Sequence, residues 1–245
     1  MFGTRVFAHR GASLAAPENT LPAIELAAAL GVGWVELDVQ LLGDGTPVIF
    51  HDERLDRCTD GAGRIADADW AAVAALDAGG WFSPRYAGTR MPRLEQALAL
   101  CRQRGLGLNL ELKPTGEEGR RTALAATVLD SLQTTGFPRE ALLLSSFDVP
   151  VLAECRRRDP GIRLGLICER VPERAGAVLQ AFGGVSLHVD WRHLDPAGVR
   201  RLCAAGIAVV AWTANRPEAV DPLWSAGLTA VITDDPNAYF VRGIR

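Results

Sequence analysis

The sequence predicts an α/β fold, a (β/α)8 TIM barrel with a small insertion after the second strand. Short aliphatic or β-branched runs alternate with amphipathic stretches rich in alanine and leucine, the pattern of repeated βα units around a parallel sheet. Eight such units fit into 245 residues, which is the size of one closed barrel. A doubly wound open sheet is the rival fold, but no GxGxxG turn follows the first strand. We therefore expect residues 1–245 to form a single domain.

The expected strands are short and mostly apolar, and a helix-like stretch follows most of them. They are Val6–His9, Trp34–Val39, Leu106–Leu112, Leu142–Ser145, Leu164–Ile167, Val185–Val189, Ala208–Trp212 and Ala230–Thr233. The clearest helical stretches are Thr20–Leu30, Ala123–Gln133, Pro196–Ala205 and Glu218–Ala226. Glycines such as Gly105 and Gly227 stand between a helix and the next strand, where helix C-caps are common.

Residues from about 43 to 91 interrupt this rhythm and are too long for a plain loop. Asp44-Gly45, between two extended runs, predicts a two-residue hairpin turn. Such a turn would place His51 directly opposite Asp38 on the neighbouring strand. The rest of the segment, which contains Trp70 and Trp81, predicts an inserted subdomain able to cap the barrel mouth.

Composition excludes several classes of function. A net charge of -3 with interspersed charges provides no basic stripe, so we expect no nucleic-acid partner. Five cysteines without CxxC spacing argue against zinc and against a disulfide framework, which favours a reducing, cytoplasmic location. We find no signal peptide or transmembrane run and expect no stable membrane anchor. The sequence leaves the oligomeric state open.

Carboxylates stand on the polar face of two predicted strands. Because side chains alternate along a strand, Glu36 and Asp38 point the same way, and so do Asn109, Glu111 and Lys113. Burying uncompensated carboxylates costs several kcal/mol each. We therefore expect Glu36, Asp38 and Glu111 to bind a hard divalent cation, Mg²⁺ or Ca²⁺.

Basic and imidazole groups surround this expected cation. Arg10 and Lys113 suit a phosphate better than a neutral substrate. Histidine can exchange a proton near neutral pH, so His9 and His51 can divide general-acid and general-base roles in cleaving a phosphodiester. The polar residues would meet at one face, since the carboxyl ends of barrel strands gather there.

Other readings of the same residues stay open at this point. The Glu36–Asp38 pair is also typical of a half-exposed edge strand, and Glu111 with Lys113 of a simple ion pair. His9 alone is consistent with a structural role, and His51-Asp52 with a turn. A structural or rim role is favoured for His188 and His193, and Thr233–Pro236 has the pattern of a helix N-cap. Trp212 and Asn215 end a strand, so either core packing or substrate contact is possible there.

Taken in order, the motifs resemble the glycerophosphodiester phosphodiesterase family, in its compact bacterial cytoplasmic form, over about residues 6 to 240. The matching runs are Ala8-His9-Arg10-Gly11, Pro17-Glu18-Asn19-Thr20, Glu36-Leu37-Asp38-Val39, Pro47-Val48-Ile49-Phe50-His51-Asp52, Glu111-Leu112-Lys113, Ser145-Ser146-Phe147, Trp212-Thr213-Ala214-Asn215 and Ile232-Thr233-Asp234-Asp235-Pro236. Each motif is weak alone, but the ordered set is specific. Residues 57–59 and 91–95 depart from the more usual family pattern.

This resemblance implies a TIM barrel that hydrolyses glycerophosphodiesters to sn-glycerol 3-phosphate and an alcohol. It implies a divalent cation held by Glu36, Asp38 and Glu111, an acid–base pair of His9 and His51, and phosphate binding at Arg10 and Lys113. Trp212 and Asn215 are expected to bind substrate.

Two further functions remain in view, a lysophospholipase D-type phosphodiesterase and a catalytically silent barrel that binds phosphorylated ligands. The sequence does not assign acid and base between the histidines. Nor does it choose between attack by water and attack by the substrate's own 2-hydroxyl.

Overall fold

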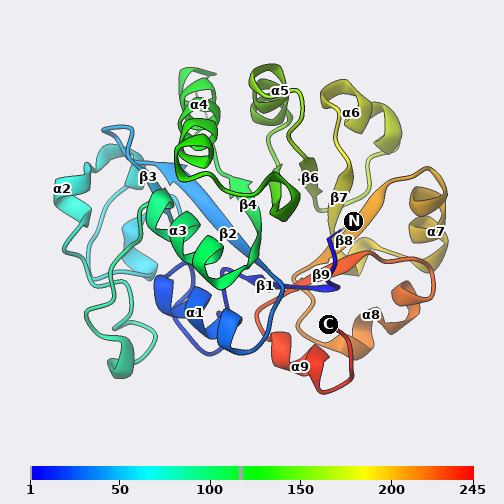
Figure 1. Ribbon diagram of the computed structural model, residues 1–245, viewed down its shortest axis with the longest axis horizontal. Helices are drawn as coiled ribbons and strands as arrows, with labels where there is room; N and C mark the ends of the chain where they lie inside the picture. The colour runs from blue at the N-terminus through cyan, green and yellow to red at the C-terminus, as the bar shows by residue number, and fades with distance from the viewer. Residues whose placement is uncertain (1, 116–117) are drawn as a thin grey trace.

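The computed structural model describes residues 2–115 and 118–245 as a closed barrel of eight parallel strands ringed by helices (Figure 1). Strand β1 pairs with both β2 and β9, which closes the ring. The barrel strands are β1 (Val6–His9), β2 (Trp34–Leu41), β4 (Gly107–Leu112), β5 (Leu142–Ser146), β6 (Leu164–Cys168), β7 (Ser186–Asp190), β8 (Ala208–Trp212) and β9 (Ala230–Thr233). The predicted fold class is confirmed.

The longer helices lie outside the ring and cover the sheet. They are α1 (Leu21–Ala29), α3 (Leu94–Arg104), α4 (Glu118–Thr135), α5 (Val149–Arg158), α6 (Ala175–Phe182), α7 (Pro196–Ala204), α8 (Pro217–Trp224) and α9 (Pro236–Phe240). Single 3₁₀ turns are η4 (Arg139–Ala141) and η5 (Trp191–His193).

Helix α4 begins earlier than the apolar pattern predicts, at Glu118 rather than Ala123. Its polar first turn has tertiary partners. Arg120 donates to the Leu41 carbonyl at 2.9 Å, and Arg121 pairs with Asp148 at 2.8 Å.

Aromatic rings plug the amino-terminal end of the barrel interior. Phe7 and Trp34 stack with their centroids 5.2 Å apart, and Phe2 packs edge-on against both rings. Gly107, on the neighbouring strand β4, faces Trp34 so closely that a Cβ there would overlap the indole ring. This layer gives the barrel interior a packed floor, so any cavity inside the barrel must lie toward the other end.

The segment between β2 and α3 folds beside the barrel, at the left of Figure 1. It contains β3 (Pro47–Ile49), η1 (Leu55–Arg57), η2 (Ile65–Asp67), α2 (Trp70–Val73) and η3 (Pro84–Tyr86). Its buried apolar side chains form their own cluster, which includes Leu42, Ile65, Val73 and Met91. The Tyr86 hydroxyl donates to the Ala15 carbonyl at 3.0 Å, which ties the segment to the loop after β1. The boundaries of about 43 and 91 for an insertion within one domain remain a proposal.

The predicted hairpin register is wrong by one residue. Val39 lies opposite Ile49, and the Asp38 carbonyl accepts from the Phe50 backbone N–H at 3.0 Å, so Phe50 rather than His51 faces Asp38. The loop has three residues because Gly45 adopts a φ of 85°, the left-handed conformation that closes such loops. Asp44 is also engaged elsewhere, since it accepts from the Trp70 backbone N–H at 2.9 Å.

We predict that Gly107→Ala destabilises the barrel floor, because the added methyl must displace the Trp34 ring. Overpacking of this kind costs about 1–3 kcal/mol in the free energy of unfolding, which urea denaturation measures. The control is Gly176→Ala in α6, where a Cβ meets nothing within 4 Å. Equal stability of the two variants would contradict the prediction.

Candidate active site

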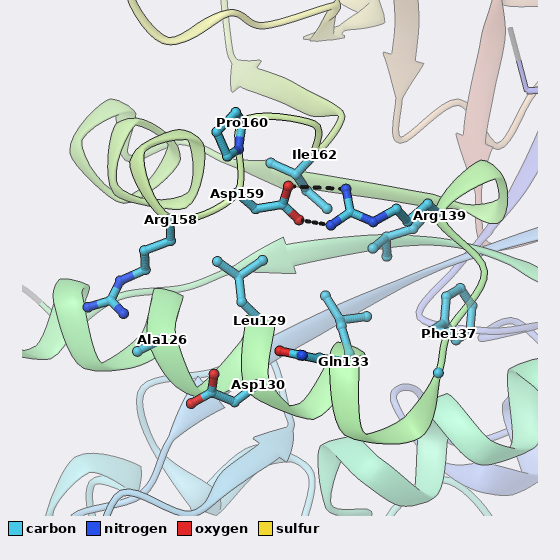
Figure 2. Close-up of a pocket in the computed structure, with 13 residues that line it drawn as sticks. Ala126, Leu129, Asp130, Gln133, Phe137, Arg139, Arg158, Asp159, Pro160 and Ile162 are labelled. Carbon is cyan, nitrogen blue, oxygen red and sulfur yellow. Dashed lines mark hydrogen bonds and ion pairs between the residues drawn. The ribbon is translucent and has the colours of Figure 1, made fainter.

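Two cavities at opposite ends of the barrel compete as the functional site. One of about 550 Å³ lies between α4 and α5, near the start of β5 (Figure 2). The charged pair that spans it is internally satisfied, because Arg139 donates to both oxygens of Asp159 at 3.1 and 2.6 Å. The cavity also contains none of the predicted site residues.

The other cavity, of about 170 Å³, lies at the carboxyl-terminal end of the strands, where barrel proteins place functional groups. We call it the site cavity. Seven of the predicted site residues line it, namely His9, Arg10, Glu36, His51, Glu111, Lys113 and Trp212. A more open cavity of about 430 Å³ adjoins it and shares His51, Glu111 and Lys113. Chemistry rather than size makes the site cavity the candidate.

Three carboxylates meet beside the site cavity. Strand register brings them together, since Glu36 is level with Asn109, and Asp38 with Glu111, on adjacent strands. Glu36, Asp38 and Glu111 each offer an oxygen, and these atoms lie within 4.8 Å of one another. Burial, with Asp38 and Glu111 nearby, raises the pKa of Glu36 well above its usual value. Burial and Asp38 raise the pKa of Glu111 to about 7.

Two cationic side chains lie against these carboxylates. Arg10 Nε is 3.3 Å from Asp38 Oδ2, and Lys113 Nζ is 3.3 Å from Glu111 Oε1 and 3.8 Å from Asp38 Oδ1. Burial alone would raise the pKa of Asp38, but Arg10 and Lys113 hold it below its usual value. Glu36 contacts the Arg10 backbone N–H at 3.1 Å.

The donor set fits a metal ion. Three carboxylates against two cationic side chains leave an excess of negative charge in a largely buried site. All three donors are oxygens, which hard divalent cations prefer. The residues can therefore hold a divalent cation between β2 and β4.

The loop after β1 positions Arg10 and a residue that the sequence reasoning left out of the site, Asn19. Both have left-handed backbones, with φ of 55° and 57°, and the Asn19 N–H donates to the Arg10 carbonyl at 2.9 Å. The Asn19 amide donates to Asp38 Oδ2 at 2.8 Å and accepts from the Asp38 N–H at 3.2 Å. Strained backbone of this kind is held by its surroundings and clusters at functional sites.

His9 is oriented by a carboxylate from the last strand. Its Nδ1 lies 2.6 Å from Asp234 Oδ1, while its Nε2 faces Glu36 Oε2 at 3.9 Å. Burial alone would raise the pKa of Asp234, but hydrogen bonds from His9, Asn215 and Ser13 hold it well below its usual value. With Asp234 on Nδ1, His9 presents Nε2 to the site cavity.

Asn215, an expected substrate contact, stands behind this pair. Its amide nitrogen donates to Asp234 Oδ2 at 2.7 Å, and its amide oxygen accepts from the Asp234 N–H at 2.9 Å and from the Thr233 hydroxyl at 3.1 Å. Asn215 is not among the residues that line the site cavity. In this structure its polar groups hold Asp234.

His51 has the same arrangement with its chain neighbour. Its Nδ1 lies 2.6 Å from Asp52 Oδ1, and its ring lines both the site cavity and the adjoining one. Burial lowers the pKa of His51, with Arg10 and Lys113 acting in the same direction and Asp38 opposing them. Although the hairpin register differs from the prediction, His51 still reaches the site.

Comparison with known proteins decides the family. Residues 9–238 match the sequence model of the glycerophosphoryl diester phosphodiesterase family. The chain belongs to this family. It is 33% identical over 243 residues to a glycerophosphodiester phosphodiesterase of Caldanaerobacter subterraneus subsp. tengcongensis, covering 96% of this chain and 95% of the relative.

Solved structures of phosphodiesterases have the same fold. An Oleispira antarctica phosphodiesterase, solved with its product sn-glycerol-3-phosphate, is 39% identical, with a TM-score of 0.91 over 95% of this chain and 93% of that one. A glycerophosphodiester phosphodiesterase from Agrobacterium tumefaciens is 26% identical, with a TM-score of 0.82 over 97% and 99% of the two chains.

In this member of the family, Trp212 forms one wall of the site cavity and is also tied to the core. Its indole N–H donates to the His188 carbonyl at 2.9 Å. Its ring packs edge-on against Phe147, with centroids 5.7 Å apart. Trp212 thus combines the structural and the cavity-lining positions that the sequence allowed.

Sequence reasoning left out Asp234, Asn19 and Asp52, which hold His9, Asp38 and His51. A signal existed for Asp234. It directly follows the last strand, and barrel closure places that strand beside the first, with Ala8 level with Thr233. Asp52 directly follows His51, but that adjacency is equally typical of a turn.

His188 lies in the barrel interior and also lines the site cavity, so the structural or rim role that the sequence favours for it stays a prediction. It is fully buried, and its Nε2 lies 3.0 Å from the Ser186 hydroxyl. Burial lowers its pKa from 6.5 to about 3. The folded state therefore keeps His188 neutral while the unfolded chain takes up a proton.

We predict that His188 makes the protein less stable as the pH falls below about 6.5. Because the folded pKa lies below the unfolded one, the unfolded state binds more protons in this window, at a cost of up to about 1.4 kcal/mol per pH unit. Denaturation at pH 7, 6 and 5 should show a shallower decline for His188→Asn than for the wild type. Parallel curves, or an NMR titration of His188 above pH 5, would contradict this.

Proposed function

We propose that this chain hydrolyses glycerophosphodiesters to sn-glycerol 3-phosphate and an alcohol, in a reaction that needs a divalent cation. The observation that carries the proposal is the meeting of three carboxylates, two cationic side chains and two carboxylate-oriented histidines around one cavity. The Oleispira antarctica relative with bound sn-glycerol-3-phosphate supports the proposed product.

Glu36, Asp38 and Glu111 would hold the cation, Mg²⁺ or Ca²⁺. When bound, such an ion polarises phosphoryl oxygens and offsets the charge that develops on them. Arg10 and Lys113, which face the carboxylates from the cavity wall, would take the remaining phosphate oxygens. The positive charges of the cation and of the two basic side chains would thus bind the phosphodiester together.

His9 and His51 would move the protons. One takes a proton from the attacking hydroxyl as its oxygen bonds to phosphorus, and the other gives a proton to the alcohol oxygen as its bond to phosphorus breaks. Asp234 and Asp52 each occupy Nδ1, which leaves Nε2 of each ring for this exchange. The carboxylates also stabilise the imidazolium form that each cycle generates.

A lysophospholipid is a second candidate substrate, favoured by apolar side chains near the cavity mouth. Phe147, which lines the cavity, is 50% exposed, and Leu14, whose backbone N–H donates to the Asp234 carbonyl at 3.0 Å, is 63% exposed.

Over residues 2–115 and 118–245, no helix is long and apolar enough to cross a membrane. The cytoplasmic location stays a prediction.

We expect activity to disappear on chelation and to return with added cation. The assay follows release of glycerol 3-phosphate from glycerophosphocholine, glycerophosphoethanolamine and a lysophospholipid, with EDTA and then Mg²⁺ or Ca²⁺. Asp38→Asn should weaken cation binding in calorimetry, because it removes one of three charged ligands. Full activity in EDTA would exclude the proposed cation role.

His9→Ala and His51→Ala should each lower kcat on the order of 10²-fold or more, the usual contribution of a general acid or base. Cation binding, measured by calorimetry, should be kept. The control is His193→Ala, which should leave kcat unchanged, because within residues 2–115 and 118–245 the polar contacts of His193 are with the Glu169 carbonyl and Asp190 and not with the site cavity. Near-normal turnover of either active-site variant would refute that histidine's assigned role.

A further inference from the structure

Three charged side chains, Asp52, Arg57 and Glu18, link His51 to Arg10. Both ends of this chain of contacts line the site cavity, and the three linking residues do not. Asp52, which contacts His51, accepts from Arg57 Nε at 2.5 Å and from Nη2 at 2.8 Å. Arg57 also donates to both oxygens of Glu18, from Nη1 at 2.8 Å and from Nη2 at 2.7 Å. Glu18 in turn accepts from Arg10 Nη1 at 2.6 Å. One guanidinium thus holds two carboxylates, each with two contacts.

Arg57 joins a residue of its own segment to a distant loop. It ends η1, in the segment between β3 and α3 that also contains Asp52, whereas Glu18 lies in the loop after β1. Arg57 is absent from the described residues that line the site cavity, and its side chain is 46% exposed. It is therefore placed to act on the site through other residues.

We infer that Arg57 is a positioning residue. It orients the His51 ring through Asp52 and the Arg10 guanidinium through Glu18. The inference rests on the proposed function for the roles of His51 and Arg10. It assigns the segment between β3 and α3 a task in the reaction.

The first branch of these contacts leads from Arg57 through Asp52 to His51. Its Nδ1 contact requires an ionised Asp52 in a fixed orientation, and a bidentate guanidinium supplies both conditions. The hydrogen bonds from Arg57 hold the pKa of Asp52 well below its usual value. Without Arg57 the carboxylate is free to turn, and the His51 ring turns with it.

The second branch concerns Arg10, whose left-handed backbone does not by itself fix the side chain. Glu18 holds one end of the Arg10 guanidinium, and Asp38 lies 3.3 Å from its Nε. Arg57 Nη2 contacts Glu18 and Asp52 together, so its removal leaves two carboxylates facing each other without the cation between them. Repulsion would then displace both.

Function should be affected more than stability. Ion pairs of half-exposed side chains contribute little to folding, but groups that orient a site typically change activity 10- to 100-fold. We therefore expect Arg57→Gln to lower kcat/KM about 10- to 100-fold with little change in Tm. Arg57→Lys should recover only part of the loss, because an ammonium cannot make both bidentate contacts. The matched control, Arg54→Gln, removes a nearby arginine that pairs with Asp56 and should match the wild type.

The two branches can be separated by different measurements. Asp52→Asn should lower kcat while inorganic phosphate binding, measured by calorimetry, stays near the wild-type value. Glu18→Gln should weaken phosphate binding. In a His51→Ala background, Arg57→Gln should no longer change kcat but should still weaken phosphate binding. A merely structural role would lower all readouts together, along with Tm.

The inference is overturned if Arg57→Gln stays within twofold of the wild type in both kcat/KM and phosphate affinity. It is also overturned if the loss in kcat persists undiminished in His51→Ala. A wild-type protein inactive on every diester would instead count against the proposed function. The phosphate measurement still tests the Arg10 branch in that case, because it needs no turnover.

Discussion

Like charges held together in a buried site are the constraint around which the rest of the molecule is arranged. Glu36, Asp38 and Glu111 offer oxygens within 4.8 Å of one another where the barrel strands end, and burial makes that repulsion expensive. Arg10 and Lys113 offset part of it, and Asn19 ties Asp38 to the first loop. The remaining negative charge suits a divalent cation, whereas binding of a phosphate beside it would depend on Arg10, Lys113 and that cation.

A second set of carboxylates, outside the first, orients the groups that would move protons. Asp234 holds His9 and Asp52 holds His51, with both contacts at 2.6 Å. These carboxylates are themselves held, Asp234 by Asn215 and Asp52 by Arg57. Each of the two histidines therefore has a supporting carboxylate, which follows the distant strand β9 for His9 and is the next residue along the chain for His51. This layering suits a site that must present Nε2 atoms in a fixed direction.

Much of the site was predictable because it follows from periodicity within single strands. The alternation in Trp34–Val39 and Leu106–Leu112 predicts that Glu36, Asp38 and Glu111 face one way, whichever strands are adjacent. The barrel follows from eight βα units, and barrel ends collect functional residues. The hairpin shows the limit of such reasoning. The Gly43 N–H donates to the Ala68 carbonyl, and Asp44 accepts from the Trp70 N–H. The hairpin loop is thus bound to residues that follow it in the chain, and it has three residues with a register shifted by one.

The fold class was predictable from the order of motifs along the chain, and local alternation predicted which carboxylates and histidines meet at one end of the barrel. The groups that support these side chains were not predictable in this way, because they depend on how distant segments pack together. The contacts of His9 with Asp234, Asp38 with Asn19, and Glu18 with Arg57 join residues 225, 19 and 39 positions apart. No periodicity encodes such pairs. They exist because the barrel closes its last strand onto its first and because the segment after β3 folds back against the loop after β1.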